Sequence, residues 1–323
     1  MFSFTIGEQN GGILTGADGL STFKIINNEF ILVEKVPESG NQGIDFQEVL
    51  QFTKDTAYVV GTTEDDEQHI YEINTEGFAS YGSITQTFTN TKGKSLKKDS
   101  INFSIGFLIA VNRVAIMSNP NDRKNYTQKE VHWDYMIEDF VLVDEDKIAL
   151  VSSSGFLSYQ SHKTGENFLQ FRLDLDTRER ISCIDIDTGS EYLAICTNKE
   201  NEFGRIFIYQ IMGTLLCHLT DFKQSDSRFP ETTRRVHDIN FKLIDVTYPV
   251  LVAFEYTMQS SMRVWRLIDR QLVEVTVHNS FVYGFFKAHQ VHMNCLWTLD
   301  DVGNLKMTPI EHVVHDISED EYR

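Results

Sequence analysis

The chain has 323 residues, with 47 acidic and 29 basic side chains and a formal net charge of −18. Its hydrophobic fraction of 41% and aromatic fraction of 12% are sufficient for a packed core, which excludes a wholly disordered chain. An acidic surface repels phosphate and anionic lipid, and no apolar run approaches the roughly 20 residues of a membrane helix, so we expect neither duplex nucleic-acid binding nor membrane insertion.

Short apolar runs rich in Val, Ile, Phe and Tyr follow one another along the chain and are separated by Gly, Asn, Asp and Ser. This pattern is typical of an all-β fold, and the runs group into sets of four strands. In chain order, the predicted strands are 2–7, 12–16, 19–26 and 29–36; 46–53, 56–62, 68–74 and 78–84; 137–143, 147–152, 155–160 and 167–173; 181–187, 192–197, 205–211 and 215–222; 236–243, 249–256, 262–268 and 271–278; and 281–288, 295–299, 304–309 and 311–317.

The interval 85–136 fits this pattern less well. Residues 101–111 and 113–118 are predicted strands, residues 130–135 form another, and the outer strands of the set are not assigned. The third strands of the two neighbouring sets, marked by Ile70 and Tyr159, lie 89 residues apart, which is about two repeat periods. The interval therefore predicts an irregular seventh set.

A repeat of four antiparallel strands cannot bury both of its faces alone, whereas repeats arranged around a common axis bury each sheet against two neighbours. The sequence thus predicts an all-β fold of the β-propeller type, with seven four-stranded blades as the main prediction and six as the alternative. We expect a single domain over residues 1–317, with the irregular blade at 85–136, followed by a short acidic tail at 318–323.

Two predicted third strands resemble the phrase that ends in Trp-Asp in WD40 repeats. They are Met262-Arg263-Val264-Trp265-Arg266-Leu267, with Arg in place of the Asp, and Arg205-Ile206-Phe207-Ile208-Tyr209-Gln210, with Tyr-Gln. The literal Trp133-Asp134 falls in the irregular set, and no Gly-His dipeptide occurs. The chain therefore resembles a divergent WD40-repeat protein, in which the family's structural network of His, Ser/Thr, Trp and Asp is expected to be mostly missing. The resemblance implies a propeller whose loops dock other proteins.

Two histidine pairs with a spacing of three residues are candidate zinc ligands. The pairs are His289/His292 and His312/His315. They fall in predicted strands and loops, where residues three apart point to opposite faces, so we interpret them as surface histidines.

The acidic groups 64–67, 144–146 and 300–301 lie at predicted turns and do not match a calcium-binding loop. The five glycines between Gly7 and Gly19 flank strands instead of opening a helix, and neither a nucleophile elbow nor a P-loop occurs. We therefore expect no catalytic residue, no metal and no cofactor.

The four cysteines, Cys183, Cys196, Cys217 and Cys295, form no Cys-x-x-Cys pair and lie in apolar runs. We interpret them as buried, reduced thiols, with a disulfide between Cys183 and Cys196 as the alternative. The first residues lack the basic end and long apolar run of a signal peptide. We therefore expect an intracellular, cytoplasmic protein, with a cytoskeletal or nuclear location as alternatives.

Basic residues gather in three segments of this acidic chain, 85–100, 119–132 and 223–235. We predict that the first and third link a fourth strand to a first strand, and that 119–132 follows a second strand. In a WD40-like propeller both types of link emerge on one face, so the three segments are predicted to form one surface for an acidic or phosphorylated protein. The predicted partner-binding residues are Lys92, Lys94, Lys97, Lys98, Arg123, Lys124, Tyr126, Arg228, Phe229, Arg234 and Arg235.

The sequence thus predicts a non-catalytic scaffold or adaptor subunit of a multi-protein complex, with other proteins of the assembly as its partners. Solvated loops without a partner are the simplest alternative for the basic segments. Two other functional classes stay open: a reader of basic peptides of the histone-tail type over an acidic funnel, and a propeller hydrolase with two funnel carboxylates.

Overall fold

The computed structural model describes β-strands and part of the segments that connect them. The described residues are 3–6, 11–16, 19–26, 29–35, 45–52, 56–62, 68–74, 77–84, 93–97, 103–118, 127–187, 189–199, 202–223, 235–243, 249–256, 261–268, 270–278, 286–292, 295–300 and 305–309. Every element of regular secondary structure assigned among these residues is a β-strand, and the strands are numbered β1 to β27. The chain divides into two compact units: unit 1 comprises Met1–Glu130 and Phe286–Met307, and unit 2 comprises Val131–Phe285 and Thr308–Arg323.

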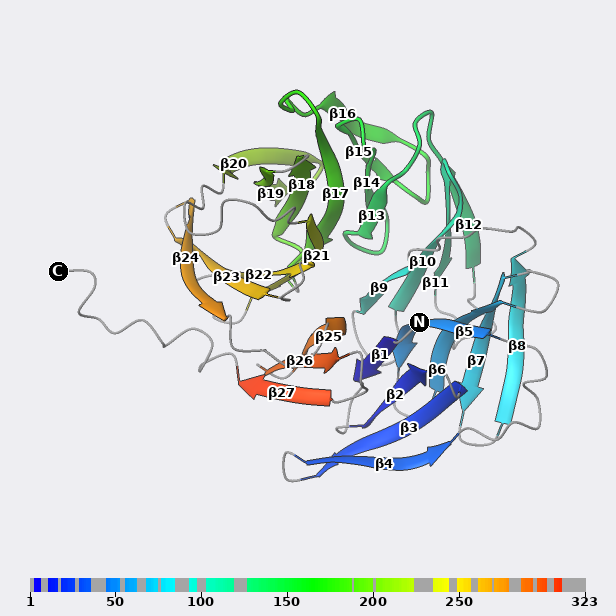
Figure 1. The fold of residues 1–323 in the computed structure, drawn as a ribbon. Helices are drawn as coiled ribbons and strands as arrows, with labels where there is room; N and C mark the ends of the chain where they lie inside the picture. The colour runs from blue at the N-terminus through cyan, green and yellow to red at the C-terminus, as the bar shows by residue number, and fades with distance from the viewer. Residues whose placement is uncertain are drawn as a thin grey trace. The chain divides into compact units, whose positions relative to one another are not determined.

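The strands of unit 1 form four antiparallel sheets among the described residues (Figure 1). Their bounds are β1 (Ser3–Ile6), β2 (Gly11–Gly16), β3 (Gly19–Ile26) and β4 (Glu29–Lys35); β5 (Asp45–Phe52), β6 (Thr56–Thr62), β7 (Gln68–Asn74) and β8 (Gly77–Ile84); β9 (Gly93–Lys97), β10 (Phe103–Ala110), β11 (Arg113–Ser118) and β12 (Thr127–His132); and β25 (Phe286–His292), β26 (Cys295–Asp300) and β27 (Leu305–Pro309). The strands β12 and β27 each run two residues past the boundary of the unit.

The strands of unit 2 form three four-stranded sheets among the described residues. Their bounds are β13 (Asp139–Leu142), β14 (Lys147–Val151), β15 (Phe156–Ser161) and β16 (Asn167–Arg172); β17 (Glu179–Ile186), β18 (Tyr192–Lys199), β19 (Glu202–Met212) and β20 (Leu215–Lys223); and β21 (Arg235–Leu243), β22 (Pro249–Tyr256), β23 (Ser261–Ile268) and β24 (Gln271–His278).

Every sheet is a simple meander in which sequence neighbours pair as antiparallel strands. Within unit 2 the first strands β13, β17 and β21 contact one another in turn, and within unit 1 the same holds for β25, β1, β5 and β9. The first strand of each sheet is therefore its inner strand, and the chain leaves each complete sheet from the fourth strand. The prediction of an all-β fold built from four-stranded repeats is confirmed, while the number of blades stays a prediction.

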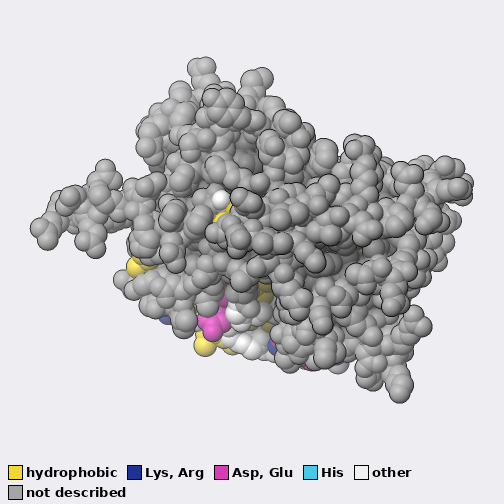
Figure 2. All heavy atoms as spheres, turned by 90° about the horizontal axis from the view of Figure 1, so that it is seen from below, with side chains coloured by type: hydrophobic (Ala, Val, Ile, Leu, Met, Phe, Trp, Pro, Cys, Tyr) yellow, Lys and Arg dark blue, Asp and Glu magenta, His cyan; other side chains and the backbone are white. Residues whose placement is uncertain are grey.

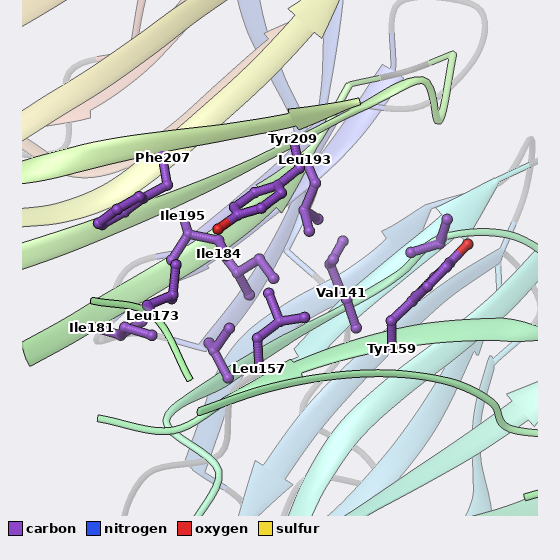
Figure 3. Packing of buried hydrophobic residues seen from close by; sticks show 13 residues of the cluster. Val141, Leu157, Tyr159, Leu173, Ile181, Ile184, Leu193, Ile195, Phe207 and Tyr209 are labelled. Atoms are coloured by element: carbon purple, nitrogen blue, oxygen red, sulfur yellow. The ribbon is translucent and has the colours of Figure 1, made fainter. Parts of the chain in front are cut away.

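The core of unit 2 is a layer of apolar side chains between the sheets β13–β16 and β17–β20 (Figure 3). Val141, Leu157 and Tyr159 of one sheet and Leu193 and Tyr209 of the other belong to this layer, and all five are at most 5% exposed. A second layer with Cys196 and Trp265 joins β17–β20 to β23 and β24. The middle sheet is thus covered on both faces, which explains why residues 193–197 of β18 are all buried.

The irregular interval folds as an ordinary sheet, and here the strand prediction was partly wrong. The predicted strands 101–111 and 113–118 are confirmed as β10 and β11, but β9 was missed and the strand predicted at 130–135 is β12, which begins at Thr127. In β9, Lys94 and Lys97 flank the apolar Leu96, so the segment lacks the β-branched and aromatic residues that mark strands. Trp133 and Asp134 follow β12 and precede β13, so the literal Trp-Asp pair does not end a third strand.

The last sheet is described for three strands. Its first strand continues to His292, beyond the predicted end at residue 288, and the strand predicted at 311–317 lies outside the described residues, as does the tail 318–323. The prediction of one domain over 1–317 stays a prediction. Among the described residues, no helix has the length and hydropathy needed to span a bilayer.

Candidate functional site

In the sheets β13–β16 and β17–β20, successive links lie alternately at the two ends of the strands, because each sheet is a meander. We call each set of strand ends, together with its links, an edge, and the two edges differ in their side chains. The second-to-third and fourth-to-first links share one end, which we name the Glu179 edge. It comprises the described residues of 152–155, 172–180 and 197–205. The first-to-second and third-to-fourth links share the other end, which we name the Met212 edge and which comprises the described residues of 143–147, 161–166, 187–192 and 212–215.

A buried ion pair lies at the centre of the Glu179 edge. The Glu179 side chain is 1% exposed and the Arg205 side chain 14%. The Arg205 Nε atom donates to Glu179 Oε1 and Oε2 at 3.1 Å each, and Arg205 Nη2 donates to Oε2 at 2.7 Å. The guanidinium also donates to the Asp174 carbonyl oxygen, and its Cζ lies 4.9 Å from the centre of the Phe207 ring. This forked geometry holds the guanidinium in one orientation.

Further donors complete the environment of the Glu179 carboxylate. The Thr197 hydroxyl donates to Oε1, and the Asp176 backbone N–H donates to Oε2 at 2.8 Å. Burial alone would raise the pKa of Glu179, but the hydrogen bonds from Arg205, Thr197 and Asp176 and the charge of Arg205 outweigh it and lower that pKa. Glu179 is therefore an ionised structural acceptor and is not poised to donate a proton.

The network ties one link to the strands beside it. Asp174 and Asp176 belong to the link between β16 and β17, whereas Thr197 lies within β18 and Arg205 within β19. The Arg205 backbone N–H donates to the Thr197 hydroxyl oxygen at 2.6 Å, where the register between β18 and β19 shifts. A Cβ atom at Gly204 would lie 1.7 Å from the Thr197 carbonyl oxygen, so only glycine fits at this position.

Side chains around this network are exposed and carry both signs of charge. Arg172, Asp174, Arg178 and Arg180 are exposed, and Lys199 Nζ lies 3.7 Å from Asp176 Oδ2. Such an edge offers charged hydrogen-bonding groups on fixed links, which is the chemistry of protein recognition. Figure 2 shows one face of the molecule, on which basic, acidic and hydrophobic side chains of the described residues lie among other atoms.

Another buried carboxylate joins the inner strands of the two sheets. Asp139, at the start of β13, is 2% exposed. Its Oδ1 accepts the Phe140 backbone N–H at 2.9 Å, and its Oδ2 accepts the Ile184 backbone N–H of β17 at 3.0 Å. Its two oxygens therefore bind backbone donors on neighbouring sheets.

Turn carboxylates organise the Met212 edge. Asp187 is 1% exposed and accepts backbone N–H groups of Gly189, Glu191 and Tyr192 at 2.7–3.1 Å. Burial raises the pKa of Asp187, and the three hydrogen bonds offset this only in part. Asp144 occupies the corresponding turn of the preceding sheet, where its Oδ1 accepts two backbone N–H groups at 2.8 Å and its Oδ2 pairs with Lys147.

The pKa of Asp144 moves in the opposite direction. Burial would raise it, but the hydrogen bond and charge of Lys147, together with the backbone donors, lower it overall. The acidic group 144–146 lies in the turn between β13 and β14, as the sequence predicted. Its carboxylates therefore shape a turn, and among the described residues no group of three or more His, Cys, Asp or Glu has the geometry for a metal ion.

The other sequence-based candidates lie as follows. His289 and His292 are both residues of β25, as expected for the strand or loop placement, and their interpretation as surface histidines stays a prediction. Cys183 and Cys196 are register partners on β17 and β18; both are buried and neither is bonded in a disulfide, in agreement with the main interpretation. Cys217 is also free but only half-buried. The acidic group 64–67, Asp301, His312 and His315 lie outside the described residues.

Three predicted partner-binding residues lie in strands. Lys94 and Lys97 belong to β9, and Arg235 is the first residue of β21. The other predicted partner-binding residues lie outside the described residues: Lys92, Lys98, Arg123, Lys124, Tyr126, Arg228, Phe229 and Arg234. The segment 85–100 therefore contains the link before β9, the strand itself and the start of the link from β9 to β10, so the placement predicted for Lys98 in a fourth-to-first link was wrong. The role of the segment in binding stays a prediction.

The placement predicted for the segment 119–132 was wrong. Residues 119–126 connect β11 to β12, the third and fourth strands of their sheet, and do not follow a second strand. A third-to-fourth link leaves a meander at the end opposite to its second-to-third link. Arg123, Lys124 and Tyr126 therefore belong to a third-to-fourth link and not to a link that follows a second strand. The error arose because β9 was missed, which shifted the strand count by one.

Sequence reasoning also missed the Glu179–Arg205 pair. The two residues are 26 positions apart, and Arg205 was identified only as the start of a Trp-Asp-like phrase. Three polar residues of opposite or complementary chemistry near one end of three consecutive strands were the available signal: Glu179 opens β17, Thr197 lies two residues before the end of β18 and Arg205 lies three residues after the start of β19.

Comparisons with known proteins give no sequence match but clear structural ones. No protein-family model matches the chain, and no curated protein matches it in sequence. The β-propeller domain of Cps50 (Swd1) from Myceliophteria thermophila is similar with a TM-score of 0.66 and 9% identity, over 95% of this chain and 96% of that one. A chain of the Mitotic Checkpoint Complex is similar with a TM-score of 0.62 and 9% identity, over 95% and 85%.

BamB from Moraxella catarrhalis is also similar, with a TM-score of 0.54 and 14% identity, over 95% of this chain and 81% of that one. At such low identities the likeness establishes the fold and not the function. The fold expected from the four-strand repeats and from the Trp-Asp-like third strands is therefore present. This chain has the fold of a divergent, WD40-like β-propeller.

Proposed function

We propose that this protein is a non-catalytic adaptor that binds partner proteins through the links of its sheets. One observation carries the proposal: the buried carboxylates of the described region are engaged in holding links and strands. Asp139 and Asp187 accept backbone N–H groups, and Glu179 accepts Arg205, Thr197 and a backbone N–H. Buried polar groups that rigidify a link reduce the ordering cost of binding a partner there.

The structural neighbours support a role in assemblies. One of them is a chain of a complex, the Mitotic Checkpoint Complex, and another is a β-propeller domain of Cps50 (Swd1). Propellers present variable links on rigid sheets, a design that suits docking more directly than it suits any particular reaction.

The basic segments extend the proposal to the chemistry of the partner. The links that precede β9 and β21 are of one type, from a fourth strand to a first strand, and carry Lys92 and Arg234 in a chain of net charge −18. A local basic link in an acidic protein favours an acidic or phosphorylated protein segment. Lys98 and the segment 119–126 are left out of the proposal, because Lys98 follows β9 in a first-to-second link and 119–126 connects a third strand to a fourth.

The test is affinity purification from the native source with charge-reversal variants. The Lys92→Glu/Arg234→Glu variant changes one residue in each of these two links and leaves the strand residues Lys97 and Arg235 untouched. We expect recovery of the co-purifying proteins to fall at least about threefold at low salt, and the difference to shrink at about 0.3 M salt because screening weakens the contacts.

The matched control is Lys129→Glu/Arg270→Glu, which makes the same charge change at two exposed residues elsewhere. This control should recover partners as well as the unmodified protein does. Equal recovery with both variants would show that the basic links do not bind the partners. The absence of any stoichiometric co-purifying protein would contradict the adaptor function itself.

A further inference from the structure

The hairpin between β19 and β20 exposes two large apolar side chains at its tip. Met212 is 57% exposed and Leu215 is 59% exposed, and the two are register partners on either side of the turn. Single exposed apolar residues are ordinary on protein surfaces, but adjacent ones on one turn form a patch. We propose that this tip is a second docking site, which takes a protein segment with an apolar anchor flanked by Lys or Arg.

Hydrogen bonds to the neighbouring sheet and to the adjacent turn hold the tip in place. The Tyr159 hydroxyl, on β15 of the neighbouring sheet, donates to the Gly213 carbonyl oxygen at 2.9 Å. The Ile211 backbone N–H donates to the Glu191 carbonyl oxygen at 2.8 Å, which ties the hairpin to the adjacent turn. Ile211 and Leu216 pack against the core between the two sheets. A patch that is already rigid loses little conformational entropy when it is covered.

Charge around the tip selects the partner. The Met212 edge contains six carboxylates and two lysines. The carboxylates are those of Asp144, Glu145, Asp146, Glu166, Asp187 and Glu191, and the lysines are Lys147 and Lys163. Glu166 and Glu191 are exposed, and Glu191 directly precedes Tyr192, which pairs with Gln210 two residues before Met212. An apolar anchor inserted at Met212 and Leu215 would therefore carry its flanking residues over carboxylates.

This electrostatic setting disfavours the other occupants. A second copy of the chain would bring the same carboxylates face to face, and an anionic membrane would be repelled by them. A basic segment with a leucine or methionine anchor gains both apolar burial and charge complementarity. The proposal goes beyond the adaptor function, since that function rests on the links at the opposite ends of the strands.

The test uses peptides as probes of the full-length protein. Fluorescence anisotropy would measure binding of a labelled peptide with two central leucines and three lysines on each side. A second peptide replaces the leucines by serine, and a third replaces the lysines by glutamate. We expect the first peptide to bind, with weaker binding as salt rises, and both altered peptides to bind at least about fivefold more weakly.

The protein variant Met212→Ser/Leu215→Ser should weaken the first peptide by about five- to tenfold, because the apolar contribution is lost while the carboxylates stay. Its matched control is Val111→Ser/Met136→Ser, which changes two apolar residues of nearly equal exposure, 56% each, away from the tip. The control should bind the peptide like the unmodified protein.

Three results would overturn the proposal. They are equal binding to the Met212→Ser/Leu215→Ser variant and the unmodified protein, equal binding of the lysine and glutamate peptides, and a dimer in light scattering that the double variant dissolves. None of them affects the adaptor function, which is tested by substitutions in other links. Because both tip residues are more than half exposed, the variants should keep the thermal unfolding midpoint, which checks that they fold.

Discussion

The two edges of the sheets β13–β16 and β17–β20 solve the same structural problem in different ways. At the Glu179 edge, a buried carboxylate and a guanidinium join the link 173–178 to the strands β17, β18 and β19, and the exposed charges are mixed in sign. At the Met212 edge, carboxylates cap tight turns one at a time, exposed acidic groups predominate and an apolar tip stands among them. One edge therefore concentrates its stabilising interactions in a single network, and the other distributes them over separate turns.

The largest expected effect is at the ion pair. Glu179→Ala leaves the Arg205 guanidinium without its buried partner, so we expect a loss of about 3–5 kcal/mol in the free energy of unfolding, measured by denaturant titration. Asp176→Ala is the control on the same edge, because its side chain is 41% exposed and contributes about 1 kcal/mol or less. Similar losses from both substitutions would contradict the concentrated network.

The variant Glu179→Met/Arg205→Met sharpens this prediction. Removing both charges leaves no unpaired ion, so the double variant should be clearly more stable than Glu179→Ala, by about 2 kcal/mol or more. A double variant as unstable as the single one would mean that the links need the hydrogen bonds themselves and not merely charge neutrality.

A glycine on each edge gives the next contrast. At Gly204 a Cβ atom would meet the Thr197 carbonyl oxygen at 1.7 Å, whereas at Gly213 nothing lies within 4 Å and only the φ of 67° opposes a side chain. We expect Gly204→Ala to cost about 3 kcal/mol through displaced backbone and Gly213→Ala about 1 kcal/mol. Equal thermal shifts for the two variants would contradict the close approach at the Glu179 edge.

The buried carboxylates of the two edges are expected to change stability with pH in opposite directions. The pKa of Glu179 is lowered below its ordinary value of 4.5, so its stabilisation is present above that pH and is lost as the pH falls through the folded-state pKa. The pKa of Asp187 is raised above 3.8, so its contribution is greatest below that pH and is lost as the pH rises through the folded-state pKa.

Unfolding midpoints between about pH 3 and 6 measure both effects. Glu179→Gln should flatten the loss of stability below pH 4.5, and Asp187→Asn should make stability rise more steeply above pH 3.8 than in the unmodified protein. Parallel curves for the two variants would show that the carboxylates do not differ as described.

The smallest effect is expected at the hairpin tip. Tyr159→Phe removes the hydrogen bond to the Gly213 carbonyl oxygen, which water can replace because Gly213 is exposed. We expect a loss of about 0.5–1.5 kcal/mol in unfolding free energy and faster amide hydrogen exchange at residues 212–215. Exchange as slow as in the unmodified protein would show that Tyr159 does not hold the tip.

Much of the fold was predictable because strands in this chain are short and apolar and are separated by turn residues. The strands 19–26, 56–62 and 68–74 were predicted with the bounds that β3, β6 and β7 have. The strand β9 was not, because Gly93–Lys97 contains one large apolar residue and two lysines. That omission also misplaced the link with Arg123 and Lys124. Links in a meander alternate between the two strand ends, so one missed strand shifts the count and assigns the next link to the wrong end.

The site was less predictable, because it depends on side chains that distant strands bring together. Glu179, Thr197 and Arg205 lie on three consecutive strands, and a sequence pattern gives no distance between such positions. The apolar tip was missed for another reason. The predicted strands 205–211 and 215–222 place the hairpin turn correctly, but a strand pattern does not show which apolar side chains stay exposed, and only the fold shows that Met212 and Leu215 do.

The adaptor account is tested most directly by hydrogen exchange of the protein with and without its co-purified partner. We predict that slowed exchange on binding concentrates in links from fourth to first strands and from second to third strands, among them 173–178, and spares the turn at 187–192. Slowed exchange confined to first-to-second turns and third-to-fourth hairpins, with none in those links, would contradict it.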